Sequence, residues 1–295
     1  MSSSGYRPDF FDDDLRLNVL GLFDVHTGQK NGKDYSIGHN LGEYANSVAQ
    51  EYNIDEIVIG GDFGSRDALT GFLNSTDEDL TVRIIEGDGD REEKKIEGEE
   101  IAGWSYHTDL EAEEPFPNTN SDYEVEGRSF RYEFENYEVW IQHENKDKSA
   151  ENILFNVEAD LRGMDYRLDE FPEEFLDFPP IIGVHGHNHR AQCSQMGSGA
   201  LFSMDSFRNA YETTSLVPDR GYHILSLGVN QVDNLHVDAD KDEIFEHHCF
   251  ELRDGSFKKE FKFGKEHKEL SPLQRFKEVP EQVRETERFN PRPTN

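Results

Sequence analysis

Short apolar segments alternate with segments of helical periodicity in the first part of the chain, and this alternation restricts the fold more than any other feature. Leu15 to Phe23, Glu56 to Gly60 and Leu80 to Ile85 have the composition of buried strands. Between them, Asn40 to Tyr52 carries apolar residues at helical spacing, and Asp67 to Leu73 suits a short helix. Strands and helices in this order predict a layered α/β fold.

The second part of the chain is richer in strands. Two alternating segments flank Glu135-Asn136, as in a β-hairpin, and a helix is predicted over 149–161. Asp254-Gly255 joins the last two predicted strands and is a dipeptide typical of tight hairpin turns. The strands predicted in this part are Ser129 to Phe134, Tyr137 to Gln142, Ile181 to Val184, Ala200 to Met204, Tyr222 to Leu227, Ile244 to Leu252 and Phe257 to Phe263.

One domain is predicted over residues 15–265, after an N-terminal extension over 1–14. Residues 92–122 are rich in Glu, Gly, Pro and Asn and lack periodicity, which predicts an irregular acidic insertion in the domain. From Ser271 onward the chain has little apolar content and four prolines, so residues 266–295 are predicted to form a tail.

The charge of the chain is strongly negative throughout. Asp and Glu number 62 against 30 Lys and Arg, a formal net charge of -32. Molar salt shortens the Debye length to roughly 3 Å and makes such a surface tolerable, so we expect a salt-rich cytoplasm, as in a halophile or a virus infecting one. The same charge argues against an extended nucleic-acid interface, which needs clustered Lys and Arg.

The remaining composition predicts an intracellular protein. Only Cys193 and Cys249 are present, too few for a disulfide framework. The N-terminal residues resemble no secretory signal, and no apolar run approaches the roughly 18 residues that span a bilayer. We therefore expect a soluble, cytoplasmic protein without a membrane partner.

Potential metal ligands follow five of the predicted strands. Strand carboxyl ends are where open α/β sheets bind ligands. In Asp24-x-His26 and His187-x-His189 the intervening residue points away, so both members of each pair can face one point. The complete set is Asp24, His26, Asp62, Asp88, His143, His187 and His189.

Carboxylate oxygen and imidazole nitrogen together suit Mn, Fe, Zn, Co or Ni. A carboxylate such as Asp62 can bridge two cations about 3.5 to 4 Å apart, a geometry that clamps both oxygens of an in-line phosphoryl displacement. The residues therefore predict two divalent metal ions and hydrolysis of a phosphate ester.

The ordered set Asp-x-His, Gly-Asp, Gly-Asp-Gly-Asp, His and Gly-His-x-His, from about Leu15 to Phe263, resembles the calcineurin-like metallophosphoesterase superfamily. The resemblance implies a four-layer αββα sandwich with two mixed β-sheets, and Mn²⁺ is the expected metal. It also implies a hydroxide, bridging the two ions, that attacks phosphorus. The implied ligands are Asp24, His26, Asp62 and His189 for the first ion, and Asp62, Asp88, His143 and His187 for the second.

Two further positions are assigned through the same resemblance. Gly61-Asp62-Phe-Gly-Ser-Arg66 looks like the family variant in which an arginine contacts the phosphate, although an arginine that starts a helix is often only solvated. His143 precedes Glu144, where the family often has glycine, so His107 is a competitor for its place. The implied catalytic residues are Arg66, His143 and His187.

The third motif departs from the family pattern. Gly87-Asp88-Gly89-Asp90 stands where the family usually has Gly-Asn-His, so Gly89 supplies no proton to the leaving group. Loss of a general acid typically costs roughly 10²- to 10⁴-fold. We therefore expect a phosphodiester, or a substrate with a good leaving group, more than a plain monoester. The alternative is an inactive scaffold that binds a protein partner through the insertion or the tail, as one relative does.

Other motifs have simpler interpretations. His185 is expected to support the neighbouring motif, and His247-His248 to be structural because adjacent residues on a strand face opposite ways. Cys193 is expected to pack in the core. The stretch from Gly28 to Asp34 resembles a phosphate-binding loop, but its glycine spacing is one residue short and Asp34 replaces Ser or Thr.

Overall fold

The computed structural model describes residues 6–12, 15–27, 34–87, 116, 119–127, 129–143, 179–186, 191–196, 198–204, 207, 221–239 and 241–264. All of them belong to one compact unit formed by residues 1–144 and 170–265. The second unit, residues 145–169 and 266–295, lies outside the described residues, as do the predicted tail and the helix predicted over 149–161. The predicted domain boundaries therefore stay a prediction.

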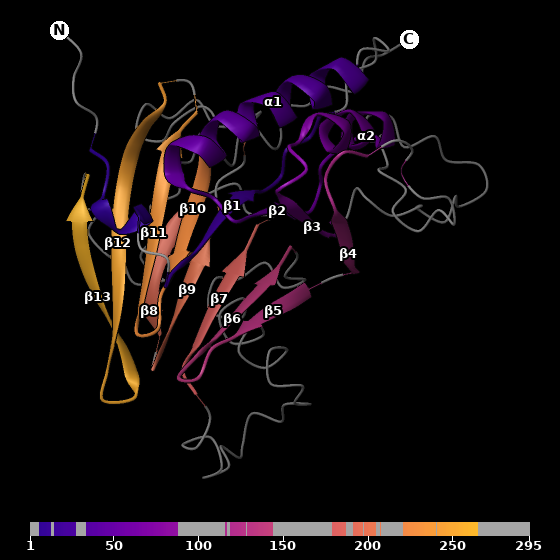
Figure 1. Ribbon diagram of the computed structural model, residues 1–295. Coiled ribbons are helices and arrows are strands. Elements are labelled where there is room, and N and C mark those ends of the chain that lie inside the picture. Colours follow the sequence, from indigo (N-terminus) through magenta and orange to yellow (C-terminus); the bar gives the residue numbers. More distant parts are fainter. Residues whose placement is uncertain are drawn as a thin grey trace, which may run out of the picture. The chain divides into compact units, whose positions relative to one another are not determined.

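The larger sheet has eight strands in the order β13-β12-β11-β10-β1-β2-β3-β4 (Figure 1). The four strands β1 to β4 are parallel, and β10 to β13 join them as an antiparallel series beside β1. The bounds are β1 Leu17–Leu22, β2 Glu56–Gly60, β3 Thr81–Ile85, β4 Tyr123–Gly127, β10 Gly221–Leu227, β11 Gln231–Asp238, β12 Glu243–Arg253 and β13 Ser256–Phe263.

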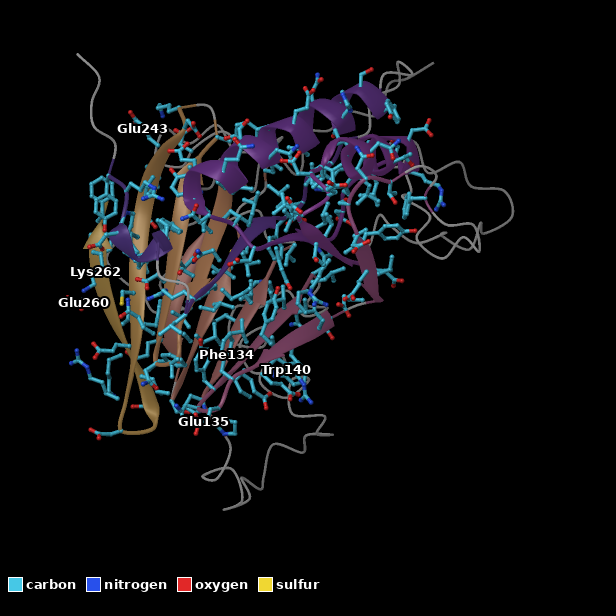
Figure 2. All side chains as sticks on the ribbon, in the orientation of Figure 1. Phe134, Glu135, Trp140, Glu243, Glu260 and Lys262 are labelled. Carbon is cyan, nitrogen blue, oxygen red and sulfur yellow. The ribbon has the colours of Figure 1, made fainter. Side chains whose placement is uncertain are left out.

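The smaller sheet has five strands in the order β5-β6-β7-β9-β8 and is also mixed. Its strands are β5 Ser129–Glu133, β6 Glu138–Gln142, β7 Ile181–His185, β8 Gln192–Met196 and β9 Gly199–Ser203. The β5–β6 hairpin turns at Glu135 and Asn136 (Figure 2 labels Glu135), and the Phe134 ring stacks on Tyr137 with centroids 4.6 Å apart. The predicted hairpin is thus confirmed.

The larger sheet has one hydrophobic core on each of its two faces. One packs helices α1 (Asp34–Tyr52) and α2 (Arg66–Ser75) against it, through residues such as Leu69 and Ile59. The other joins the two sheets, through residues such as Val58 and Phe202. The predicted α/β class with two mixed sheets is confirmed. No described helix is both long and apolar enough to cross a membrane.

Helix α1 begins at Asp34, well before Asn40, where the apolar periodicity starts. Its first turns contain Gly38, which lies where α1 packs closely against α2. A Cβ atom at Gly38 would lie 1.7 Å from the Ala68 carbonyl oxygen. On the other side, a Cβ atom at Gly71 would lie 2.1 Å from the Tyr35 carbonyl oxygen. The two helices therefore approach backbone to backbone, which their low-propensity glycines allow.

Gly38→Ala should destabilise the protein by about 1 to 3 kcal/mol, because the added methyl group would push α1 away from α2. In a helix without this contact the same change should stabilise by up to about 1 kcal/mol. Urea denaturation at fixed KCl would measure the difference, with Ser47→Ala on the exposed side of α1 as the control. A more stable Gly38→Ala protein would contradict the close packing.

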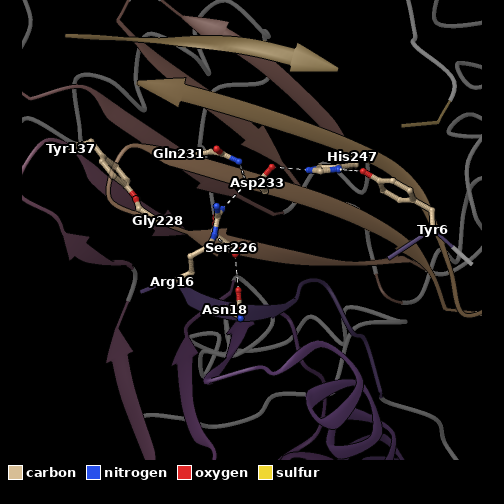
Figure 3. Close-up of polar contacts among 9 residues, drawn as sticks. All are labelled: Tyr6, Arg16, Asn18, Tyr137, Ser226, Gly228, Gln231, Asp233 and His247. Atoms are coloured by element: carbon tan, nitrogen blue, oxygen red, sulfur yellow. Dashed lines mark hydrogen bonds and ion pairs between the residues drawn. The ribbon is translucent and has the colours of Figure 1, made fainter. Parts of the chain in front are cut away.

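A buried polar network connects the N-terminal segment to the larger sheet (Figure 3). Asp233 on β11 is 1% exposed and accepts hydrogen bonds from Arg16 Nη2 at 2.5 Å, His247 Nε2 at 2.7 Å and Gln231 Nε2 at 2.7 Å. On this assignment, His247 Nδ1 accepts the Tyr6 hydroxyl at 2.7 Å. Burial opposes ionisation of Asp233, but the bond from His247 and the charge of Arg16 outweigh it and lower the pKa of this carboxyl.

Candidate metal centre

Two loops at the carboxyl ends of β1 and β2 run side by side. The backbone N–H groups of Asp24, His26 and Thr27 donate to the carbonyl oxygens of Gly61, Asp62 and Phe63 at 3.2, 2.9 and 2.7 Å. The two strands pair in parallel, and these bonds continue the pairing beyond them. The loops therefore bring Asp24 and Asp62 together.

The backbone is strained at three of the predicted ligands. Asp24, His26 and Asp62 have φ angles of 49°, 48° and 49°, in the left-handed region that few residues other than glycine adopt. Each residue held in such a conformation costs of order 1 to 3 kcal/mol of stability, and residues of this kind tend to cluster at functional sites. The hydrogen bonds between the loops hold this conformation.

Asp24, Asp62 and His143 form one group of potential metal ligands, whose ligand atoms all lie within 4.8 Å of one another. His143 follows β6, and its Nε2 atom lies 3.3 Å from Asp62 Oδ2 and 3.8 Å from Asp24 Oδ1. His26 Nε2 lies 4.0 Å from Asp24 Oδ1. Three chain segments thus bring two carboxylates and an imidazole to one point.

The group is buried on one side and more open on the other. The side chains of Asp24 and His143 are 0% exposed, whereas those of Asp62 and His26 are 12% and 21% exposed. The group is therefore more accessible to solvent from the side of Asp62 and His26.

A backbone hydrogen bond orients the imidazole of His143. Its Nδ1 atom lies 2.7 Å from the carbonyl oxygen of Gly60, which can only accept, so Nδ1 carries the donated hydrogen. Nε2 then faces Asp24 and Asp62. Metal-ligating histidines usually have a second nitrogen held in this way.

Glycines surround the group where side chains would intrude. A Cβ atom at Gly61 would lie 2.3 Å from His143 Cγ, and one at Gly87 would lie 2.3 Å from Asp62 Oδ1. These contacts explain why glycine precedes aspartate in the Gly61-Asp62 motif, and why glycine is needed at 87. The packing, the mixed donor set and the orientation of His143 all fit a divalent cation.

The protonation of His143 follows from its neighbours. Burial disfavours the imidazolium, but the hydrogen bond to Asp62 and the charges of Asp24 and Asp62 outweigh it, so the pKa of His143 is raised to about 10. Below that pH, a cation bound to Nε2 must displace a proton.

Metal affinity should therefore fall as the pH is lowered, with the apparent Kd rising roughly tenfold per pH unit for one displaced proton. Isothermal titration of Mn²⁺ at pH 6.5, 7.5 and 8.5 in constant KCl would measure this slope. Repeating each titration in two buffers of different ionisation enthalpy would count the released protons. An affinity independent of pH would show that a proton on His143 does not compete with the metal.

The other predicted ligands, Asp88, His187 and His189, lie outside the described residues, as does the competitor His107. The glycines that precede two of these ligands are described. Gly87 adjoins Asp62, and a Cβ atom at Gly186 would lie 2.8 Å from Asp24 Oδ2. The chain therefore reaches the group immediately before Asp88 and immediately before His187.

Arg66 starts α2 shortly after Asp62, and its Cζ atom lies over the Phe116 ring, 4.3 Å from the centroid. Sequence reasoning did not identify Phe116, because it stands in the irregular insertion without a recognisable pattern. Two other contacts were also not predicted: the Gly60 carbonyl that orients His143, and the pairing of the loops.

The histidines and cysteine interpreted as structural have partners in the sheets. His185 is buried at the end of β7, and His248 Nε2 lies 3.2 Å from Glu246 Oε2. Burial raises the pKa of the Cys193 thiol to about 12. A thiol with that pKa is a poor nucleophile at neutral pH.

No protein-family model matches the chain, and no curated protein matches it. Solved structures with a similar arrangement include a predicted phosphoesterase from Streptococcus pneumoniae, at 12% identity and a TM-score of 0.43, covering 84% of this chain and 98% of that one. Vacuolar protein sorting 29 from Cryptosporidium parvum is 16% identical with a TM-score of 0.41, covering 85% and 100%. An archaeal phosphodiesterase is 12% identical with a TM-score of 0.39, covering 83% and 100%. Likeness this distant transfers no activity, metal or partner to the present chain.

Proposed function

We propose that the protein is a phosphoesterase that uses two divalent metal ions, with hydroxide attack on phosphorus, and prefers phosphodiesters to phosphomonoesters. The observation that carries the proposal is the buried group of Asp24, Asp62 and His143 at the ends of β1, β2 and β6. Two carboxylates and an oriented imidazole suit a transition metal better than Mg²⁺ or Ca²⁺, which prefer oxygen ligands alone. Mn²⁺ is the proposed metal, with Fe, Zn, Co or Ni as substitutes.

The proposed ligands divide into two sets that share Asp62. One set adds Asp24, His26 and His189 to it, and the other adds Asp88, His143 and His187. When bound, two cations would neutralise charge on the phosphoryl oxygens and make water a better nucleophile at neutral pH. The structure supports the grouping of Asp24, Asp62 and His143, with His26 beside them. The assignment of Asp88, His187 and His189 rests on their sequence motifs.

Each described residue has a physical task in this proposal. The buried carboxylate of Asp24 and the partly exposed carboxylate of Asp62 provide negative charge that a cation would balance, which makes the site selective for cations. The Gly60 carbonyl keeps Nε2 of His143 aimed at them. Arg66 would contact the phosphate, because it starts α2 at the end of the loop that carries Asp62.

The preference for a diester comes from Gly89, which has no side chain to protonate a leaving group. Substrates with poor leaving groups, such as alkyl monoesters, should suffer most from the missing acid. The proposed substrates are small phosphodiesters or nucleotides, and the proposed setting is a cytoplasm rich in salt.

A direct assay compares bis(p-nitrophenyl) phosphate with p-nitrophenyl phosphate in Mn²⁺ and high KCl. We expect a higher kcat/KM for the diester, together with bound transition metal in the purified protein. A strong preference for the monoester would contradict the diester proposal. Absence of both bound metal and hydrolysis at every salt concentration would favour the scaffold that binds a protein partner.

A further inference from the structure

We infer that Phe116 is a positioning residue that holds the guanidinium of Arg66 beside the metal centre, where Arg66 binds an anionic oxygen of the phosphoester. This inference rests on the proposed function and deepens it. It assigns a role in substrate binding to the carboxyl-terminal end of the acidic insertion.

The length of the loop limits how far Arg66 can lie from the metal centre. Arg66 is the fourth residue after Asp62, so the two Cα atoms are at most roughly 14 Å apart. Gly64, with φ of 124°, turns the loop between them, and the Ser65 hydroxyl caps α2 by accepting the Ala68 N–H at 3.2 Å. The positive end of the α2 dipole therefore lies at the same end as Arg66.

An aromatic ring holds the guanidinium. The Arg66 Cζ atom lies 4.3 Å from the Phe116 centroid, well inside the roughly 6 Å range of a cation–π contact. Phe116 is only 7% exposed, so the contact is largely sheltered from water. The ring thereby restricts where the guanidinium can lie.

Phe116 is itself anchored from two sides. Its N–H donates to the Tyr123 hydroxyl at 3.2 Å, and the two rings meet edge to face with centroids 5.4 Å apart. Tyr123 is the first residue of β4, within the larger sheet. Asn120 N–H and Ser121 Oγ both donate to the Leu73 carbonyl on α2, at 3.2 and 3.3 Å. The ring thus belongs to a segment bonded both to β4 and to the helix that begins at Arg66.

The electrostatics of the site make a fixed cation useful. Bound cations would balance the charge of Asp24 and Asp62, but in a chain of net charge -32 the surrounding surface still repels an approaching phosphate. The simpler interpretation is that Arg66 only shields the ring from water. That interpretation predicts changes in stability alone, whereas a positioning role also predicts changes in phosphate affinity.

The test measures the inhibition constant of inorganic phosphate, and KM and kcat for bis(p-nitrophenyl) phosphate, on the full chain in Mn²⁺. Arg66→Met should raise the inhibition constant and KM about tenfold or more, the effect expected from losing a hydrogen bond to a charged group. Phe116→Leu should raise both by about two- to fivefold, with a smaller effect on kcat. Phe116→Trp, which keeps an aromatic face, should stay within about twofold of the wild type.

The double variant separates positioning from packing. If Phe116 acts through Arg66, Phe116→Leu should have no further effect in the Arg66→Met background. Wild-type phosphate inhibition in Phe116→Leu, or an equal effect of Phe116→Leu in both backgrounds, would overturn the inference. If Phe116→Leu does not fold, Phe116→Met supplies the same comparison with a side chain that fills gaps more readily.

Failure of the inference can be told apart from failure of the proposed function. An active wild type whose phosphate inhibition is unchanged by Arg66→Met would overturn the inference alone. A wild type that hydrolyses no phosphoester with any divalent metal would overturn the proposed function, and the inference with it.

Discussion

Asp62→Ala should remove tightly bound divalent metal from the purified protein and lower phosphodiester hydrolysis by more than about a hundredfold. Loss of an outer-shell partner of a metal ligand already costs about 10- to 100-fold, and Asp62 is proposed to ligate both ions. The structure places its carboxylate 3.3 Å from His143 Nε2, within the group of three potential ligands. Elemental analysis of metal content, with kcat/KM for the diester, would measure both effects.

The matched control for this experiment is Asp79→Ala, which removes an exposed carboxylate before β3 and should change neither quantity. Asp62→Asn keeps the shape of the side chain and removes its charge, so it should behave like Asp62→Ala if charge binds the cations. If Asp62→Ala bound as much metal as the wild type, the group of Asp24, Asp62 and His143 would not be the metal site.

Asp233→Ala should destabilise the domain by about 3 to 5 kcal/mol, because it leaves the Arg16 guanidinium and the His247 imidazole buried without their shared carboxylate. The side chains of Arg16 and His247 are 8% and 4% exposed, so water cannot easily replace Asp233. Urea denaturation at constant KCl would measure the loss. The control is Glu251→Ala, which breaks an exposed ion pair between Glu251 and Arg253, both on β12. It should have little effect on stability.

The stabilisation by Asp233 should also depend on pH in a definite direction. The pKa of its carboxyl in the folded protein lies below the ordinary value of 3.8. Its contribution is therefore fully present above that value and is lost as the pH falls through the folded pKa. The difference in stability between wild type and Asp233→Ala should shrink below about pH 4, provided both proteins still fold there. A difference that grows on acidification would contradict the assigned ion pair between Asp233 and Arg16.

The strands that sequence patterns predicted are those whose signals are local. The β12–β13 hairpin forms at Asp254-Gly255, where both residues have positive φ angles, 50° and 71°, as this tight turn requires. The strands β1, β2 and β3 are short apolar runs and were likewise predicted close to their observed bounds. In each case the information lies within the strand or its turn.

The strands β4, β8 and β11 were not predicted. Polar residues dominate β8, although its pairing partner β9 follows it directly in the sequence. β11 places Asp233, Asn234 and His236 in the interior, which a hydrophobic pattern excludes. Their partners lie on other elements: Asn234 Oδ1 lies 3.0 Å from His223 Nδ1, and the His236 and His223 rings stack with centroids 4.7 Å apart. Burial, and then the charge of His236, keep the pKa of His223 well below its ordinary value.

The candidate site divides in the same way. Asp24, Asp62 and His143 could be predicted because each follows an apolar strand, and carboxyl ends of neighbouring strands meet. The contact between Arg66 and Phe116 could not, since Phe116 belongs to an irregular segment and is held by Tyr123 on β4, a strand that pairs with β3 far away in the sequence. Sequence motifs identified the candidate ligands, but not the residues that orient them.

The glycines around the metal centre affect how this protein could change over evolutionary time. At Gly61 and Gly87, gaining any side chain would displace His143 or Asp62 without altering a ligand. A lineage could therefore lose the proposed metal binding through one codon change while every aspartate and histidine remained. Among natural variants of this chain, a bulky residue at 61 or 87 would be an earlier sign of lost metal binding than a missing ligand.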